Sequence, residues 1–132
     1  MASSALTQPS YTSSMADKPL LGMTIGDKFD QIATQYADND ALIVLHQHIH
    51  WSYRQLQEEV NRCARALLAI GVQKGDRVAI WAPNCSEWTL TQFATAKIGA
   101  ILVNINPSYR THELEYALNQ SGARFLVTAN NF

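Results

Sequence analysis

Two stretches of this chain follow one pattern, although they share few letters. Gly71–Asn84 (GVQKGDRVAIWAPN) and Gly99–Pro107 (GAILVNINP) each begin with a glycine, continue into an apolar run and end in a turn. A glycine that follows an amphipathic segment is typical of a helix C-terminus, and a short run that is apolar on both faces is typical of a buried strand. A third example runs from Gly122 to Thr128. Helices that alternate with buried strands predict a parallel α/β sheet.

A helix and a short hairpin are predicted before this unit. Thr24 and Asp27 have the spacing of a capping box. The apolar residues that follow repeat on one helical face: Ile25, Phe29, Ile32, Ala33 and Tyr36. Two apolar runs, Ala41–Leu45 and Ile49–Trp51, then predict two antiparallel strands joined by a short link.

A longer helix is predicted between the hairpin and Gly71. Ser52 and Gln55 form a second capping box at its start, and Gly71 follows its end. Its apolar face consists of Leu56, Val60, Cys63, Ala64 and Leu67. Gln73–Asp76 then predicts a turn, and Val78–Trp81 a central strand that is covered on both faces.

The later helices are predicted from their caps and their apolar residues. Ser86 is the expected N-cap of a helix that is apolar nearly all round, and Thr111 of a shorter one that ends at Gly122. The inward residues expected in the shorter helix are Leu114, Ala117 and Leu118. The predicted fold class is α/β, with an N-terminal helix and a short β-hairpin followed by a βαβαβ unit whose parallel sheet is covered by helices.

Composition predicts one globular unit and argues against several classes of partner. The 132 residues are 47% apolar and 16% charged, with a net charge of −1. Without a basic stripe, a nucleic-acid partner is not expected. No apolar run approaches the ~20 residues of a membrane span, and no secretory signal is visible, so the sequence predicts a cytoplasmic protein. Cys63 and Cys85 have no metal-binding spacing and are expected to be reduced, packed thiols.

The chain divides into a tail and one domain. Residues 1–20 are rich in Ser, Thr and Ala and are expected to form a disordered tail, whereas residues 21–132 form the α/β subdomain. A transit peptide stays open as an alternative, because acidic residues are absent before Asp17, although arginine is absent as well. Met15 stays open as a downstream start.

Asparagines lie where the predicted parallel strands end. Asn84, Asn104 and Asn106 follow two of these strands, and ligands of open α/β sheets bind at the carboxyl ends of the strands. These side chains are therefore candidates for lining a crevice. The alternative, which we favour, is that they hydrogen-bond within strand-to-helix turns.

Other polar clusters give weaker signals. His46, His48 and His50 alternate, as three ligands on one strand would, but the hairpin turn is expected inside the cluster and would break that geometry. The carboxylates Glu87, Glu113 and Glu115 lie near helix starts, where they favour the helix dipole. The tryptophans are expected in the core: Trp51, Trp81 and Trp88.

Phosphate-binding motifs are missing from the sequence. It has neither the GxGxxG pattern nor a glycine-rich loop that ends in Lys-Ser or Lys-Thr, and Gly71 and Gly75 flank Lys74 in a turn rather than at a helix start. We therefore assign no catalytic, cofactor-binding or metal-binding residue in this chain.

Several patches together resemble the N-terminal part of the adenylate-forming superfamily, which includes acyl-CoA synthetases, luciferases and peptide-synthetase adenylation domains. The resemblance covers about residues 24 to 128, and the stretch Asn106–Arg110 is most similar to fatty-acyl-CoA synthetases of the medium-chain kind. The matching patches are Thr24–Ala33, Trp51–Leu56, Gly71–Val78, Ala82–Asn84, Gly99–Ala100, Asn106–Arg110 and Glu113–Tyr116.

The resemblance implies a two-step ligase reaction in a longer parent enzyme. ATP and a fatty acid give an acyl-adenylate and pyrophosphate, and CoA then displaces AMP. The family's phosphate loop, nucleotide contacts and catalytic lysine all come later than this chain's last residue. ATP, Mg²⁺ and CoA are thus implied for the parent only. What carries over is scaffold: Gly71, Gly75, Asp76, Asn84, Gly99 and Pro107.

The resulting expectation is an N-terminal fragment whose partner is the remainder of the parent enzyme. Alone, it is expected to be inactive and to self-associate, since apolar surface would stay uncovered. The alternative from another class is a stand-alone α/β binding or regulatory module without catalysis.

Overall fold

The computed structural model describes residues 17–18 and 20–130, and its elements follow the predicted α/β order. Most of the predicted tail, residues 1–20, lies outside the described part. The elements are α1 (Ile25–Gln35), β1 (Asp40–Val44), the 3₁₀ helix η1 (Leu45–Gln47), β2 (Ile49–Ser52), α2 (Tyr53–Ala69), β3 (Arg77–Trp81), α3 (Ser86–Ile98), β4 (Ile101–Asn104), α4 (Thr111–Ser121) and β5 (Phe125–Thr128).

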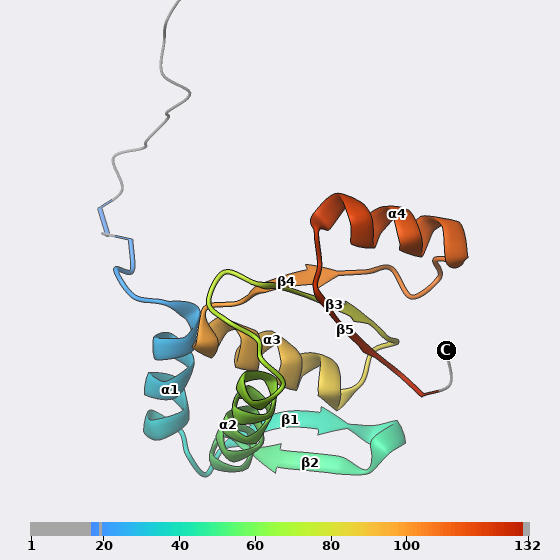
Figure 1. Cartoon of the computed structure of the whole chain (residues 1–132). Helices are drawn as coiled ribbons and strands as arrows, with labels where there is room; N and C mark the ends of the chain where they lie inside the picture. Colours follow the sequence, from blue (N-terminus) through green and yellow to red (C-terminus); the bar gives the residue numbers. More distant parts are fainter. Residues whose placement is uncertain (1–16, 19, 131–132) are drawn as a thin grey trace, which may run out of the picture.

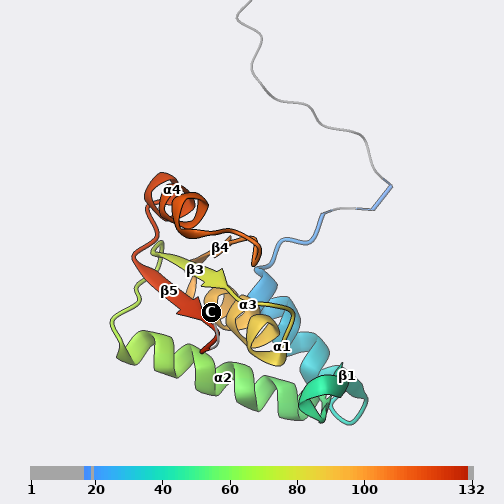
Figure 2. The same ribbon diagram turned by 90° about the vertical axis from the view of Figure 1, so that its right-hand side faces the viewer.

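The parallel sheet has β3 at its centre, in the order β4-β3-β5. Val78 of β3 pairs with Leu102 on one side and with Phe125 on the other. The crossover through α3 runs from β3 to β4, whereas the crossover through α4 runs back past β3 to β5. Because both crossovers are right-handed in such sheets, opposite directions place the two helices on opposite faces. Figures 1 and 2 show α4 on one side of the sheet and α3 on the other.

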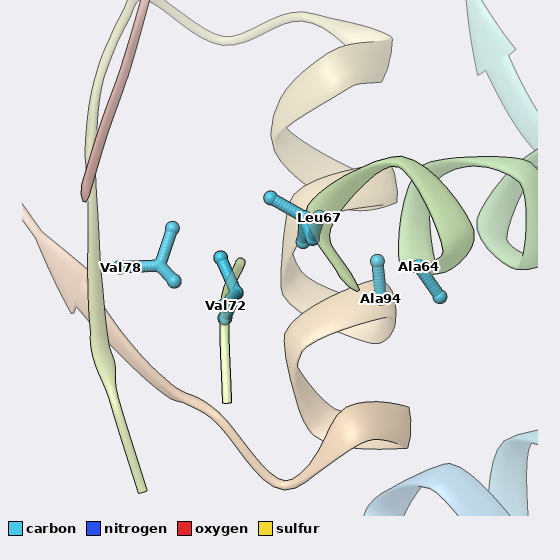
Figure 3. Close-up of a cluster of buried hydrophobic side chains, with 5 residues drawn as sticks. All are labelled: Ala64, Leu67, Val72, Val78 and Ala94. Atoms are coloured by element: carbon cyan, nitrogen blue, oxygen red, sulfur yellow. The ribbon is translucent and has the colours of Figure 1, made fainter. Parts of the chain in front are cut away.

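The main core lies between the sheet and the pair α2 and α3. Its buried side chains come from α2, the link that follows it, β3 and α3: Ala64, Leu67, Val72, Val78 and Ala94. Figure 3 shows Val72 between Val78 and the helices. Phe125 and Val127 of β5 pack against the same cluster, so this face of the sheet is the well-covered one.

A second core joins α1 to the hairpin and to α3. Phe29 of α1 is buried and stacks on Phe93 of α3, with ring centroids 4.5 Å apart. Beside the rings, Lys97 Nζ contacts Asp30 Oδ1 at 2.6 Å, and Gln57 Nε2 donates to the same oxygen at 2.7 Å. Burial works to raise the pKa of Asp30, but the bonds from Lys97 and Gln57 outweigh burial and hold that pKa below its usual range.

Helix ends predicted from local sequence are confirmed at five places. The Ser52–Gln55 capping box is present at α2, and Thr24 accepts the Asp27 amide at α1. Gly71, Gly99 and Gly122 have φ values of 94°, 72° and 66°, in the left-handed region that glycine adopts without strain.

Two predicted N-caps are wrong. Helix α3 begins at Ser86 itself, with Cys85 at the N-cap position. Helix α4 begins at Thr111, and the amide of the preceding residue, Arg110, donates to Glu113 Oε2 at 3.1 Å. In both places a hydroxyl residue lies one position too late, so its side chain does not serve the first turn.

Burial also differs from the periodicity in three helices. In α1 the face predicted from Ile25 to Tyr36 is only partly used, because both of these residues are exposed. The most buried side chains of α3 include two polar ones, Thr91 and Thr95, whose hydroxyls donate to carbonyls of the preceding turn. Helix α4 has no buried residue, so its predicted inward residues (Leu114, Ala117 and Leu118) are only half-covered.

A glycine-to-alanine change tests the close contact between α1 and α3. A Cβ on Gly26 would lie 3.0 Å from the backbone Cα of Lys97, so one helix must move. We expect Gly26→Ala to lower the free energy of unfolding by about 1–3 kcal/mol, although alanine favours helices, because the clash is with backbone. Urea denaturation measures the change.

Gly22→Ala is the matched control, because a Cβ at Gly22 meets nothing within 4 Å. If Gly26→Ala, Gly22→Ala and the unsubstituted chain were equally stable, the close contact between α1 and α3 at Gly26 would not constrain the fold.

Candidate functional site

A cavity of about 430 Å³ lies at the carboxyl ends of β3 and β5. Ile80 and Val127 supply apolar surface from the strands themselves. The remaining wall comes from the segments that follow these strands, the hairpin tip and the start of α3: His46, Gln47, Ala82, Pro83, Cys85, Glu87, Thr128, Ala129 and Asn130. Carboxyl ends of parallel strands are where open α/β sheets bind ligands, so this cavity is the candidate site.

Gln47 fastens the hairpin to the start of α3. Its Oε1 accepts the Ser86 amide at 2.7 Å, and its Nε2 donates to Glu87 Oε2 at 2.8 Å. The Ser86 hydroxyl donates to the same carboxylate oxygen at 3.0 Å. The first turn of α3 is therefore capped by a side chain from about forty residues earlier in the chain.

At the start of α3, the pKa of Glu87 is lowered and the pKa of Cys85 is raised. The hydrogen bond from Gln47 is the main cause that holds the pKa of Glu87 below its usual range, and the backbone amide of Glu87 and the Ser86 hydroxyl act in the same direction. Burial raises the pKa of the Cys85 thiol, and the nearby Glu87 carboxylate raises it further. At neutral pH the site therefore holds a carboxylate and a neutral thiol.

Bound phosphate does not fit this cavity. Lysine and arginine are absent from its lining residues, and its one carboxylate, Glu87, would repel an anion. A helix N-terminus is often an anion site, but here the free amide of Ser86 is taken by Gln47. In the described part of the chain, no group of three His, Cys, Asp or Glu side chains is placed to hold a metal. The residues present fit neither ATP nor Mg²⁺.

The three candidate asparagines do not meet in one crevice. Asn84 lines a neighbouring shallow cavity over β1 and α3, whereas Asn104 and Asn106 lie at the end of β4 and line neither cavity. The Oδ1 atom of Asn106 accepts the Ser108 amide at 2.9 Å, as the turn interpretation predicts for it.

The histidine cluster is broken by the turn, as expected. His46 lies in η1 and His48 has φ 53°, so the alternation of a strand stops there. His50 Nε2 lies 2.8 Å from Asp40 Oδ1 across the hairpin. Among the tryptophans, Trp51 packs on the second core and Trp88 lines the shallow cavity, while Trp81 is half-buried at the end of β3.

Sequence reasoning missed the residues that shape the cavity. From the sequence, Glu87 is expected only to interact with the helix dipole, and no pattern gives Gln47 a role. The available signal was indirect: the hairpin turn lies in an HQH stretch, and α3 has Cys85, a poor cap, where a good one is usual. Nothing in the sequence says that the missing cap comes from the hairpin.

Comparison with protein families assigns this fold. The model of the family described as AMP-binding enzyme matches residues 29–131. The chain belongs to the AMP-binding enzyme family. Its relatives include the medium-chain acyl-CoA ligase ACSF2, mitochondrial, from mouse, which is 42% identical over 93% of this chain and 20% of its own length. The human protein of the same name is 40% identical over all 132 residues and 22% of its own length.

Solved structures of similar fold include N-terminal domains of longer proteins. The N-terminal domain of FACL13 from Mycobacterium tuberculosis is 33% identical with a TM-score of 0.77, over 80% of this chain and 26% of that chain. The N-terminal subdomain of NpsA from Klebsiella oxytoca is 30% identical with a TM-score of 0.77, over 83% of this chain and 28% of the NpsA chain. The chain thus spans about a fifth of the length of the curated relatives that it matches.

Of the helices in the described part of the chain, none combines the length and the hydrophobicity that a membrane span needs. Both cysteines are free and partly buried, in agreement with the prediction of packed side chains.

Removal of the Gln47 side chain tests the hairpin-to-helix link. We expect Gln47→Ala to lower the free energy of unfolding by about 1–2 kcal/mol at pH 7, because the Ser86 amide and the Glu87 carboxylate both lose a partner. His46→Ala, in the same turn and exposed, is the control and should change stability little. Urea denaturation compares them.

The hydrogen bond between Gln47 and Glu87 also predicts that the stability of the fold depends on pH. A carboxyl group whose pKa is lowered by folding stabilises the fold above its unfolded pKa of about 4.3, and this stabilisation is lost as pH falls through the folded pKa. Gln47 is the main cause of the lowered pKa of Glu87. The difference in free energy of unfolding between the unsubstituted chain and Gln47→Ala should therefore narrow as the pH falls below about 4.3, and a difference that stays constant with pH would exclude this link.

Proposed function

We propose that this chain is the N-terminal part of an ATP-dependent fatty-acid–CoA ligase of the medium-chain type. The proposed reaction joins a fatty acid to ATP, giving an acyl-adenylate and pyrophosphate, and CoA then displaces AMP to give the acyl-CoA. One observation carries this proposal: a medium-chain acyl-CoA ligase is 42% identical over 93% of the chain. The similarity to the N-terminal domain of FACL13 supports the same position within a longer enzyme.

The proposed role of the chain within that enzyme is structural. Its helices and sheet supply one layered unit, and the cavity at the strand ends lacks cationic side chains. The charge of ATP and Mg²⁺ would thus be stabilised by parts of the enzyme outside these residues. We infer that the chain alone has no ligase activity, and that ATP, Mg²⁺, CoA and fatty acid act on the longer protein.

The inactive-scaffold proposal is tested by pyrophosphate–ATP exchange. With a medium-chain fatty acid, ATP and Mg²⁺, the 132-residue chain should give exchange at the level of a protein-free blank. Calorimetry with ATP and Mg²⁺ should show no binding. Pyrophosphate–ATP exchange above the blank, or tight binding of ATP, would contradict the proposal that the nucleotide site lies outside these 132 residues.

The ligase proposal itself is tested on the reading frame that contains these residues. If the frame continues past Phe132 into a Thr-Ser-Gly-Thr-Thr-like loop, its product should form acyl-CoA in an ATP- and CoA-dependent assay. A stop codon directly after Phe132 would instead favour a stand-alone binding or regulatory module.

We propose a cytoplasmic location. The names of the ACSF2 relatives contain the word mitochondrial, which describes those proteins. Imaging of a C-terminal fluorescent fusion in cells decides between the two compartments, and import into mitochondria would overturn this proposal.

We propose further that the chain associates with itself through its sheet. Leu126 of β5 and Ile101 of β4 are 41% and 48% exposed, and both β4 and β5 are edge strands among the described elements. Unpaired edges with apolar side chains pair readily with another copy.

Light scattering tests this association. At high protein concentration, the measured mass of the unsubstituted 132-residue chain should exceed the 14.7 kDa of its monomer. Leu126→Lys should reduce that excess, because a charged side chain blocks pairing at the strand edge. Ile70→Lys, at an exposed apolar residue after α2, is the control. A clean monomer at every concentration would exclude the proposal.

A further inference from the structure

A second concave surface, an apolar groove, lies where the chain enters α1 and shares no lining residue with the cavity at the strand ends. Its volume is about 350 Å³. Its walls come from the segment before α1, from α1 itself, from Tyr53 at the start of α2 and from Phe93 in the middle of α3. The lining residues are Leu21, Met23, Thr24, Ile25, Lys28, Phe29, Ile32, Tyr53 and Phe93. In Figure 1 this region is at the blue end of α1, away from the hairpin tip.

The groove leaves large apolar side chains in contact with solvent. Leu21 and Ile25 are 68% and 67% exposed, and Met23 is 44% exposed. Single exposed apolar residues are ordinary, but these line one concave surface together with the ring of Phe93. Ile25, which periodicity places on the inward face of α1, lines this groove instead of the core and is therefore exposed.

We propose that residues 1–16 of the same chain occupy this groove. These residues precede Asp17, which lies four positions before Leu21, the first residue of the groove wall. Each residue of extended chain spans at most about 3.3–3.6 Å, so the stretch from Tyr11 to Leu21 is long enough to turn back over the groove. The occupant and the groove therefore need no second molecule to meet.

The chemistry of residues 1–16 matches the groove. They contain no charged side chain, and their large apolar residues are Met1, Leu6, Tyr11 and Met15. The one charged lining residue, Lys28, donates to Gln31 Oε1 at 2.9 Å along α1. A polar, serine-rich segment of this composition does not bury enough apolar surface to fold by itself, but it can become ordered on a preformed apolar surface.

Methyl-detected NMR of the full 132-residue chain tests the proposal. Tyr11→Ser combined with Met15→Ser should shift the methyl resonances of Met23, Ile25 and Ile32, because an aromatic ring and a thioether leave their surroundings. The resonance of Ile101, in the parallel sheet, should stay in place and shows that the variant is folded. Ser13→Ala combined with Ser14→Ala, in the same segment, is the matched control and should leave all four unchanged.

Stability measurements give a second readout. If the segment fills the groove, Tyr11→Ser/Met15→Ser and Ile25→Ser should each lower the melting temperature, and the combined variant should lose less than the sum. Unchanged groove resonances, or fully additive losses, would overturn the proposal. Groove resonances that shift on dilution, together with a mass that doubles on concentration, would identify a second copy as the occupant and would also overturn it.

Discussion

The structure depends on the complete burial of one strand. Val78, Ala79 and Ile80 of β3 are each 0% exposed, although successive side chains of a strand point to opposite faces. Such a strand needs a layer on each face and a strand on each edge, and α2 with α3, α4, β4 and β5 meet these four requirements. The cover is unequal, because a compact core packs beneath Val78 whereas α4 has no buried residue of its own.

Helix α3 joins the two halves of the molecule because it is held differently at each end. At its start, Gln47 of the hairpin turn takes the free amide of Ser86. Near its end, Lys97 pairs with Asp30 of α1 at 2.6 Å. Between them, Phe93 stacks on Phe29 and Ala94 packs into the main core. The position of the hairpin tip, and so the shape of the cavity at the strand ends, follows from contacts that are far apart in the sequence.

Sequence patterns predicted the features that depend on neighbouring residues. The glycine stops, the Ser52–Gln55 box and the central strand need only a few residues to be recognised, and all are present. The cap of α3 and the Asp30–Lys97 pair were not predicted, because each joins residues that only the folded chain brings together. The three asparagines do not share a crevice, and Asn106 hydrogen-bonds within its own turn, which is the interpretation that the sequence favoured for these residues.

The order of strands has a consequence for synthesis. β3 is the first strand of the parallel sheet to leave the ribosome, but it pairs with two strands that are made later, and Val78 meets Phe125 last. Until then, one edge of the most apolar segment of the sheet has no neighbour. Contacts between residues so distant in sequence also form slowly. A nascent chain therefore presents this edge to other polypeptides and to chaperones until residue 128 has emerged, which makes β5 the step that ends the vulnerable period of folding.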